Sequence, residues 1–345
     1  MRLGIHRGPG FSDRWIEWCE AQGVAWKPVD CYRSDIVAQL ADCDGLMWHW
    51  HQTNPKDVLF ARQLTAALEA GGKAVFPDVA TSWHFDYKVA QKYLFEAIGA
   101  PSPPTQVFYD LASALRWIGE AEFPQVFKLR RGAGSVNVQL VRTRGEARRL
   151  AQQAFGRGFA VVNRLAEIRD NARKARRTGD LQPLLKAARS AARLVRPNTF
   201  ERQDGRERGY LYLQAFAPDN DHDTRVVVVG DRAWALRRRV RPNDFRASGS
   251  GDALYDPDGI DRRMLRIALD VRAKLGAQCL SFDFVRGADG APLIVEISYG
   301  FPIGAFLDNC PGHWDGALTF HADQENRPQH FMAADLVARI RAQRA

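Results

Sequence analysis

The chain has 345 residues, of which 46% are hydrophobic and 26% charged, and its formal net charge is +9. This length predicts two or three domains or subdomains with substantial cores. No apolar run approaches the roughly 20 residues of a membrane span, and no apolar signal core follows the N-terminus. Five scattered cysteines without zinc-type spacing predict reduced thiols. We therefore expect a cytoplasmic protein with no membrane partner.

The positive charge raises the hypothesis of a nucleic-acid binder, but much of it lies in two segments. Residues 164–208 are basic and predicted to be helical, either as a solvated insertion or as a grip on an acidic substrate or partner. The second segment, Arg237–Arg239 with Arg241 and Arg246, lies beside predicted strands. Arginines there more often meet phosphates or carboxylates in a pocket. A nucleotide is the expected polyanion, and nucleic acid is the less favoured partner.

Residues 1–80 alternate between strand and helix patterns. Strands are predicted at 3–6, 26–29, 46–50 and 74–76, and helices at 12–21, 34–40 and 55–70. This order predicts a parallel sheet, whose ligand-binding edge would carry His6, Arg7, residues 8–10 and residues 48–51. Neither GxGxxG nor GxxxxGK[ST] occurs. His49 and His51 share strand parity and are either substrate contacts or surface residues, with metal binding the less favoured alternative.

The next segment carries two lysines in notable positions. Residues 83–98 form an amphipathic helix with Lys88, after a boundary near 78–82. Strands follow at 105–109 and 125–129, with a helix at 111–120 between them. Lys128 then precedes a glycine loop, Gly132-Ala133-Gly134-Ser135, and a strand at 136–141. Strand, glycine loop and strand predict a flap whose backbone amides close over phosphates.

The C-terminal part is predicted to be rich in strands. Strands at 210–216, 224–229 and 232–238 precede a polar segment at 241–258, a helix at 260–275 and a terminal helix at 331–342. In the strand at 232–238, alternation directs either Arg238 alone or Arg237 and Arg239 toward a bound nucleotide.

Two further strands carry the most informative carboxylates, Asp283 and Glu296. Asp289-Gly290 between them predicts a two-residue type I′ turn. Closing the hairpin there puts Asp283 opposite Glu296, with the pairs Ser281/Ser298 and Val285/Ile294 on the same face.

Two acids directly opposite each other destabilise a sheet, so a positive charge is expected between them. A hard divalent cation bound by carboxylate oxygens is one answer. The alternative is that one acid is solvated while the other pairs with an arginine.

In chain order, the chain therefore presents a helix lysine, a lysine before a glycine loop, a Gln-aromatic strand end, Asp-x-Arg, Asn-Asp-Phe-Arg-x-Ser and the Asp…Glu-x-Ser hairpin. Over residues 80–310 this order resembles the ATP-grasp superfamily, particularly glutathione synthetase, the RimK-type glutamate ligases and D-alanyl-D-alanine ligase. The resemblance implies an α/β and α+β protein. A parallel α/β pre-ATP-grasp domain (1–80) would precede two ATP-grasp subdomains (81–213, with the basic insertion at about 164–208, and 214–345, with the metal hairpin).

The resemblance also implies roles for individual residues. Metal binding falls to Asp283, Glu296 and Ser298, where Ser298 stands in place of the family's usual Asn. Nucleotide contacts fall to Lys88 and Lys128, the flap residues Gly132, Ala133, Gly134 and Ser135, the hinge Gln214, Ala215 and Phe216, and to Asp223, Ala247 and Ser248. The residues expected around the transferred phosphate are Arg225, Arg239 and Arg246; for the strand at 232–238, the family pattern favours Arg239.

The function that the resemblance implies is an ATP-dependent carboxylate-amine ligase that forms an acyl phosphate and releases ADP and phosphate. Its cofactors would be ATP and Mg²⁺, with Mn²⁺ as a substitute, and its partners a small-molecule or peptide carboxylate and amine. A homo-oligomer is compatible with the sequence. The alternative is an ATP-binding regulatory or scaffolding protein without ligase turnover, and the two differ in whether ADP is formed.

Overall fold

The structure, a computed structural model, describes residues 1–8, 10–132, 137–160, 205–242, 244–248, 251–304, 309–323 and 327–345, together with residues 185 and 188. The chain divides into two compact units. Unit 1 comprises Met1–His51, Lys56–Pro103 and Ala217–Ala345, and unit 2 comprises Gln52–Pro55 and Pro104–Phe216. Residues 81–103 thus belong to the same unit as both the N-terminal and the C-terminal regions, whereas the sequence places them in a domain that begins at residue 81 and ends at residue 213. The three-domain division stays a prediction.

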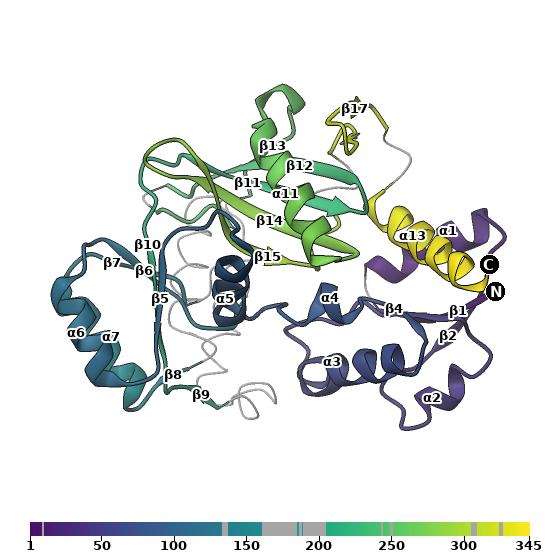
Figure 1. Cartoon of the computed structure of the whole chain (residues 1–345), viewed down its shortest axis with the longest axis horizontal. Helices are drawn as coiled ribbons and strands as arrows, with labels where there is room; N and C mark the ends of the chain where they lie inside the picture. Colours follow the sequence, from purple (N-terminus) through teal and green to yellow (C-terminus); the bar gives the residue numbers. More distant parts are fainter. Residues whose placement is uncertain are drawn as a thin grey trace. The chain divides into compact units, whose positions relative to one another are not determined.

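The N-terminal part of unit 1 is the predicted parallel sheet, with strand order β2-β1-β3-β4 (Figure 1). Its elements are β1 (Arg2–His6), α1 (Phe11–Ala21), β2 (Ala25–Val29), α2 (Ile36–Gln39), β3 (Gly45–Met47), α3 (Pro55–Ala70) and β4 (Ala74–Phe76). β3 ends earlier than predicted, so residues 48–51 leave the sheet at the carboxyl ends of the strands. The histidines His49 and His51 are therefore loop residues.

The C-terminal part of unit 1 contains a seven-stranded sheet among the described residues. Its order is β15-β14-β11-β12-β16-β17, with β13 paired to β12. The strands are β11 (His222–Val229), β12 (Arg232–Arg239), β13 (Ala253–Leu254), β14 (Cys279–Arg286), β15 (Pro292–Ser298), β16 (His313–Trp314) and β17 (Phe320–His321). After the short helix η1 (Pro257–Gly259), α11 (Arg262–Leu275) packs across β11, β12 and β14 (Figure 1). The face of the sheet that α11 covers is apolar and includes Val226, Val228, Phe282 and Phe284.

Helices α4 (Val79–Ser82) and α5 (Lys88–Ile98) follow β4 in unit 1. The predicted single helix over 83–98 is wrong in its start, because α5 begins at Lys88. α5 lies against the edge strand β15. There the buried Gln91 amide accepts from the Ile297 N–H at 3.1 Å and donates to the Ile297 carbonyl at 2.8 Å. The side chain thus occupies the place where another strand would pair.

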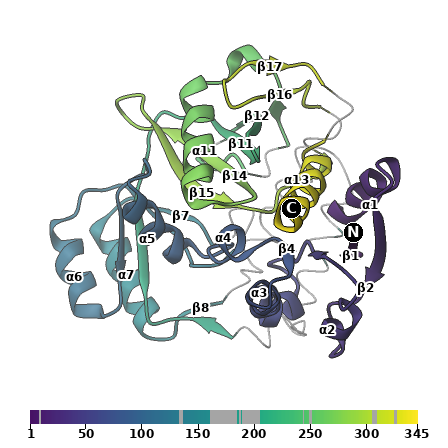
Figure 2. The same cartoon turned by 45° about the vertical axis from the view of Figure 1, so that its right-hand side comes forward.

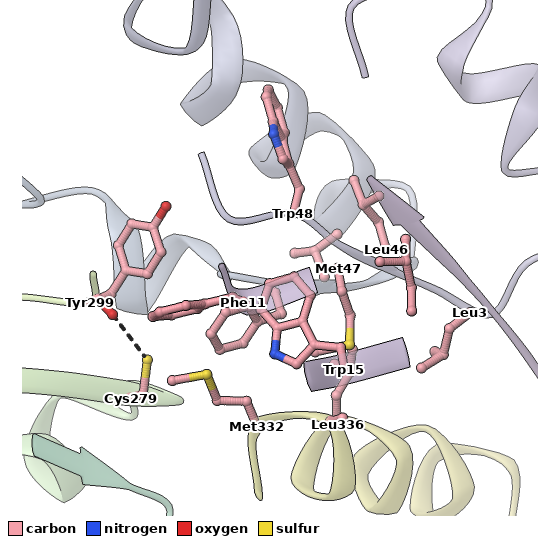
Figure 3. Close-up of a cluster of buried hydrophobic side chains, with 14 of the residues drawn as sticks. Leu3, Phe11, Trp15, Leu46, Met47, Trp48, Cys279, Tyr299, Met332 and Leu336 are labelled. Carbon is pink, nitrogen blue, oxygen red and sulfur yellow. Dashed lines mark hydrogen bonds between the residues drawn. The ribbon is translucent and has the colours of Figure 1, made fainter. Parts of the chain in front are cut away.

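One hydrophobic core joins both sheets of unit 1 to the terminal helix α13 (Pro328–Arg344). Figure 3 shows Leu3 and Trp15 from the N-terminal region gathered with Met332 and Leu336 of α13. α13 also packs against α1, and the two chain ends lie together (Figure 2). Asp44 binds both ends, through the Met1 amine at 3.9 Å and the Arg344 guanidinium. The N-terminal sheet therefore depends on the C-terminal helix for its core.

Unit 2 has its own core around a four-stranded sheet of order β5-β10-β6-β7. Its elements are β5 (Thr105–Phe108), α6 (Leu111–Glu120), β6 (Gln125–Phe127), β7 (Gln139–Val141), α7 (Arg144–Phe155) and β10 (Leu211–Ala215), with a separate pair β8 (Phe159–Ala160) and β9 (Arg206–Glu207). Asp110 and Thr143 cap α6 and α7 by accepting from backbone N–H groups in the first turn. In the described parts of both units, no helix is long and apolar enough to cross a membrane.

Candidate functional site

Strands β14 and β15 form the hairpin on which the sequence interpretation depends. Asp283 lies opposite Glu296, and Ser281 opposite Ser298. The predicted two-residue turn is wrong, however. The Gly287 N–H donates to the Ala291 carbonyl at 2.9 Å. This bond leaves a three-residue loop that ends at Gly290 with φ +74°, the left-handed conformation such loops require.

A β-bulge in β15 corrects for the longer loop. The extra residue of the bulge is Val295. Between the bulge and the loop, Val285 lies opposite Leu293, whereas the predicted partner was Ile294. A one-residue slip would otherwise turn every later side chain to the opposite face. The bulge therefore restores the expected facing of Asp283 and Glu296, while Ile294 is buried on the α11 side.

A row of charged side chains crosses four adjacent strands on the face opposite α11. Strand register puts these residues on one face, because directly opposed residues share a face and alternate residues return to it. This charged row consists of Arg238 on β12, Asp223 and Arg225 on β11, Asp283 on β14, Glu296 on β15 and Lys88 from α5.

The charged row is held by short contacts. Arg225 binds Asp283 with two parallel bonds, Nε to Oδ1 at 2.8 Å and Nη2 to Oδ2 at 2.9 Å. Arg238 bridges two acids, since its Nη2 lies 2.5 Å from Asp223 Oδ2 and 3.0 Å from Asp283 Oδ2. Lys88 Nζ lies 3.1 Å from Glu296 Oε1. Paired forks of this kind are the strongest charge-assisted hydrogen bonds.

Burial and these contacts shift the pKa values of three members of the row in different directions. Burial acts to raise the pKa of the Asp283 carboxyl, but Arg225 and Arg238 together hold it well below its ordinary value. For Asp223, burial prevails over the shared Arg238, so its pKa is raised. Burial likewise opposes the charge of Lys88, yet Glu296 and Asp86 raise its pKa overall. Asp283 and Lys88 are therefore charged at neutral pH.

Ser298 and the loop after it adjoin the N-terminal sheet within unit 1. The Ser298 hydroxyl donates to the Gly300 carbonyl at 2.7 Å and accepts from the Gly300 N–H at 3.1 Å. A Cβ at Gly300 would lie 3.2 Å from His49 Nε2, so the close approach favours glycine. His49 is stacked on Phe11 at 3.9 Å, and burial, with His51 as a smaller cause, lowers the pKa of His49 to about 3. His49 is therefore a neutral buried ring at pH 7.

Unit 2 holds the second predicted lysine. Lys128 follows β6, is 7% exposed and donates to Gln214 Oε1 at 2.7 Å. Gln214 in turn donates to the Thr105 hydroxyl at 3.1 Å. In the predicted hinge, the Ala215 N–H donates to the Pro104 carbonyl at 2.8 Å, so that group is used within the unit.

The polar segment after β12 brings the remaining expected residues together. Arg246 binds the nearby Asp244 through Nε at 2.9 Å and Nη2 at 2.6 Å. Ala247 is buried, and the Ser248 carbonyl accepts from Arg241 Nε at 2.9 Å. Arg239, in contrast, has a side chain that is 61% exposed and lies 3.7 Å from Asp252. The structure therefore does not gather Arg239 into the charged row.

This architecture was compared with known proteins by sequence and by structure. No protein-family model matches the sequence, and no curated protein matches it.

Solved structures do match over nearly the whole chain. A RimK domain ATP-grasp protein from Sphaerobacter thermophilus is 17% identical with a TM-score of 0.54, covering 98% of this chain and all of that one. The D-alanine–D-alanine ligase from Bacillus anthracis, complexed with ATP, is 13% identical with a TM-score of 0.56, covering 100% and 99%. The ATP-grasp ligase PsnB, complexed with a minimal precursor, Mg and ADP, is 14% identical with a TM-score of 0.53, covering 99% and 98%. The chain has the ATP-grasp fold.

On this ATP-grasp fold, the expected site residues fall into three groups. Asp223, Arg225, Asp283, Glu296 and Lys88 lie together in the charged row. Lys128 and Gln214 are in contact in unit 2, and Arg246, Ala247 and Ser248 share the segment after β12. Gly132 has φ +124°, while the flap residues Ala133, Gly134 and Ser135 and most of the basic insertion lie outside the described residues. The roles of all these residues stay predictions.

Sequence reasoning favoured Arg239 over its neighbour Arg238. Alternation had offered it as one of two choices, and β12 now directs it toward Asp223 and Asp283. Gln91, which binds both backbone groups of Ile297, was also missed. A glutamine on the buried face of an amphipathic helix was the available signal, because a buried amide needs partners.

The donor set fits a hard divalent cation in its chemistry. Asp283 and Glu296 supply carboxylate oxygens from facing positions, and Ser298 supplies a hydroxyl. In the described residues no three of His, Cys, Asp and Glu form a metal-binding cluster. Arg225 and Arg238 instead neutralise Asp283 from the side of β11 and β12, and Lys88 neutralises Glu296. Each acid is thus paired with a cation of the protein itself.

Proposed function

We propose that the protein is an ATP-dependent carboxylate-amine ligase that forms a C–N bond through an acyl phosphate and releases ADP and phosphate. The observation that carries this proposal is the charged row on an ATP-grasp fold, in which two facing carboxylates adjoin a buried lysine and two arginines. The fold's matches include proteins named as ligases, and two of them were solved with ATP or with Mg and ADP.

In the proposed reaction, a substrate carboxylate oxygen attacks the γ-phosphorus of ATP, the bond from that phosphorus to the bridging oxygen breaks, and ADP leaves. An amine nitrogen then attacks the acyl carbon, phosphate leaves with the electrons of the C–O bond, and the nitrogen releases a proton. Two anions must approach each other in the first step, so catalysis depends on positioning and on cations around both.

The residues have matching roles in this proposal. Lys88 and Lys128 would neutralise phosphate oxygens, and Arg225, Arg239 and Arg246 would surround the transferred phosphate. Asp283 and Glu296, with Ser298, would hold Mg²⁺, or Mn²⁺ in its place. When bound, the metal supplies positive charge to the phosphate oxygens.

Further nucleotide contacts are proposed for the flap Gly132–Ser135, for main-chain groups of Gln214–Phe216 and for Asp223, Ala247 and Ser248. Substrates would be a small-molecule or peptide carboxylate and amine. A cytoplasmic location belongs to the same proposal, supported by five buried free cysteines.

The test is ADP formation with Mg²⁺ and a panel of amino-acid and peptide substrates. Asp283→Asn and Glu296→Gln should each lower turnover about 100-fold or more, because each removes a carboxylate proposed to hold the metal whose positive charge positions the reacting anions. Asp231→Asn, at the exposed turn between β11 and β12, is the matched control and should retain activity.

Thermal unfolding of each variant with ATP and Mg²⁺ separates lost chemistry from lost folding. Intact turnover in Asp283→Asn and Glu296→Gln would contradict the proposed mechanism. ATP-dependent stabilisation of the wild type without ADP formation with any substrate pair would instead favour a nucleotide-binding regulatory protein.

A further inference from the structure

The Asp283 carboxylate is surrounded by guanidinium groups although it is the expected metal ligand. Its Oδ1 accepts from Arg225, and its Oδ2 accepts from both Arg225 and Arg238, all at 2.8–3.0 Å. The Asp283 side chain is 14% exposed. A divalent cation on these oxygens would therefore lie beside two positive charges in a poorly hydrated site, where repulsion is weakly screened.

The two arginines differ in what would hold them once Asp283 is released. Arg238 also binds Asp223, through Nε at 2.7 Å and Nη2 at 2.5 Å, and would keep that partner. The bidentate contact of Arg225 is to Asp283 itself. Its release would leave a half-buried guanidinium whose main anion has been taken, which is costly unless another anion replaces it.

A phosphate is a suitable replacement. Guanidinium forks bind phosphate oxygens with the same paired geometry that they use for carboxylates, so the exchange keeps the hydrogen bonds of Arg225. The nucleotide thus supplies the anion that Arg225 needs and frees the carboxylate that the metal needs.

We propose that Arg225, supported by Arg238, locks the Asp283 carboxylate in the nucleotide-free protein, so that a divalent metal binds this chain only together with the phosphates of a nucleotide. This inference rests on the proposed function, since it takes Asp283 as a metal ligand and a nucleotide as the phosphate source. Binding of metal and nucleotide is then coupled, and the coupling is reciprocal.

The test measures Mn²⁺ binding directly, by the loss of the free-ion electron paramagnetic resonance signal, without any turnover. Wild-type protein should bind Mn²⁺ alone at least tenfold more weakly than Arg225→Gln, in which the main lock is removed. Arg232→Gln, at the start of β12 and paired with Asp335, is the matched control and should behave as wild type. Arg238→Gln should also bind Mn²⁺ alone more tightly than wild type does. It serves as the test of the lock if Arg225→Gln does not fold.

ADP is then added to each protein, and its binding is followed by thermal unfolding. The lock would be overturned if wild type bound Mn²⁺ alone as tightly as both Arg225→Gln and Arg238→Gln do. If wild type were still stabilised by Mn²⁺ with ADP, that result would leave the proposed function intact. Wild type that is not stabilised by ADP with Mn²⁺ or with Mg²⁺ would overturn both. Tighter metal-only binding in the variants, with weaker dependence on ADP, is the expected result.

Discussion

The seven-stranded sheet buries side chains on both faces, but by different means. Under α11, aliphatic and aromatic side chains such as Val226, Phe282 and Ile294 exclude water by packing. On the opposite face, apolar side chains such as Val227 and Trp234 pack in the other core of unit 1, and beside them the charged row holds acids and bases that neutralise one another. Packing energy scales with the area buried, whereas buried charge is tolerated only in pairs. The same strands therefore supply a rigid support on one face and a charge-balanced site on the other.

The largest effect is expected on the packed face. Phe282→Ala should lower the free energy of unfolding by about 3–5 kcal/mol, because it removes a fully buried ring and leaves a cavity. Urea unfolding measures this change. Leu59→Ala, on an exposed position of α3, is the control and should stay within about 0.5 kcal/mol of wild type. A similar loss in both variants would mean that the α11 face is not the source.

On the charged face, the loss should depend on pairing rather than on size. Arg238→Leu should lower the free energy of unfolding by about 3 kcal/mol, because Asp223 loses its partner inside the protein. The double variant Arg238→Leu with Asp223→Leu should recover much of that loss, since Asp283 still binds Arg225. Urea unfolding of the two single variants and the double variant measures the coupling. If the double variant loses as much free energy of unfolding as the two single variants together, Arg238 and Asp223 do not behave as a coupled pair.

A buried histidine outside the charged row should make the free energy of unfolding depend on pH. His49 has a folded-state pKa of about 3 against an ordinary value of 6.5, so its neutral form is favoured by folding. Its contribution is fully present above pH 6.5 and is lost as the pH falls toward 3. His49→Phe should therefore remove about 2 kcal/mol of the stability difference between pH 7 and pH 5.

Urea unfolding at the two pH values measures this difference. The same substitution at the half-exposed His321 is the control. An equal reduction in both variants would show that burial of His49 is not the cause. Within the row, Asp283 and Lys88 should contribute little over this range, because the pKa of Asp283 lies below it and that of Lys88 above it.

Much of the sheet could be predicted from local patterns. Alternation along β11 is enough to put Asp223 and Arg225 on one face, and closing the hairpin of β14 and β15 is enough to put Asp283 opposite Glu296. The parallel N-terminal sheet followed from the order of strands and helices. Both depend only on neighbouring residues.

Features that depend on distant partners were harder to predict. Asp289-Gly290 is compatible with either a two- or a three-residue loop, and the bulge at Val295 depends on how β15 meets its neighbours. Which of Arg238 and Arg239 faces Asp223 and Asp283 depends on the register of β12 against β11, which the sequence of β12 alone does not contain. The guanidinium contacts of Asp283 likewise join residues far apart in the chain.

Gln91 has a consequence for association between molecules. β15 is the outermost strand of its sheet, and the free N–H and C=O groups of an edge strand are a template for a strand of another chain. Gln91 occupies both groups of Ile297, and the Pro101 carbonyl accepts from the Ile294 N–H at 2.8 Å. These contacts interrupt the template along the strand that carries Glu296. The acid can therefore stand at the margin of the sheet, next to its site, without making that margin a point of aggregation.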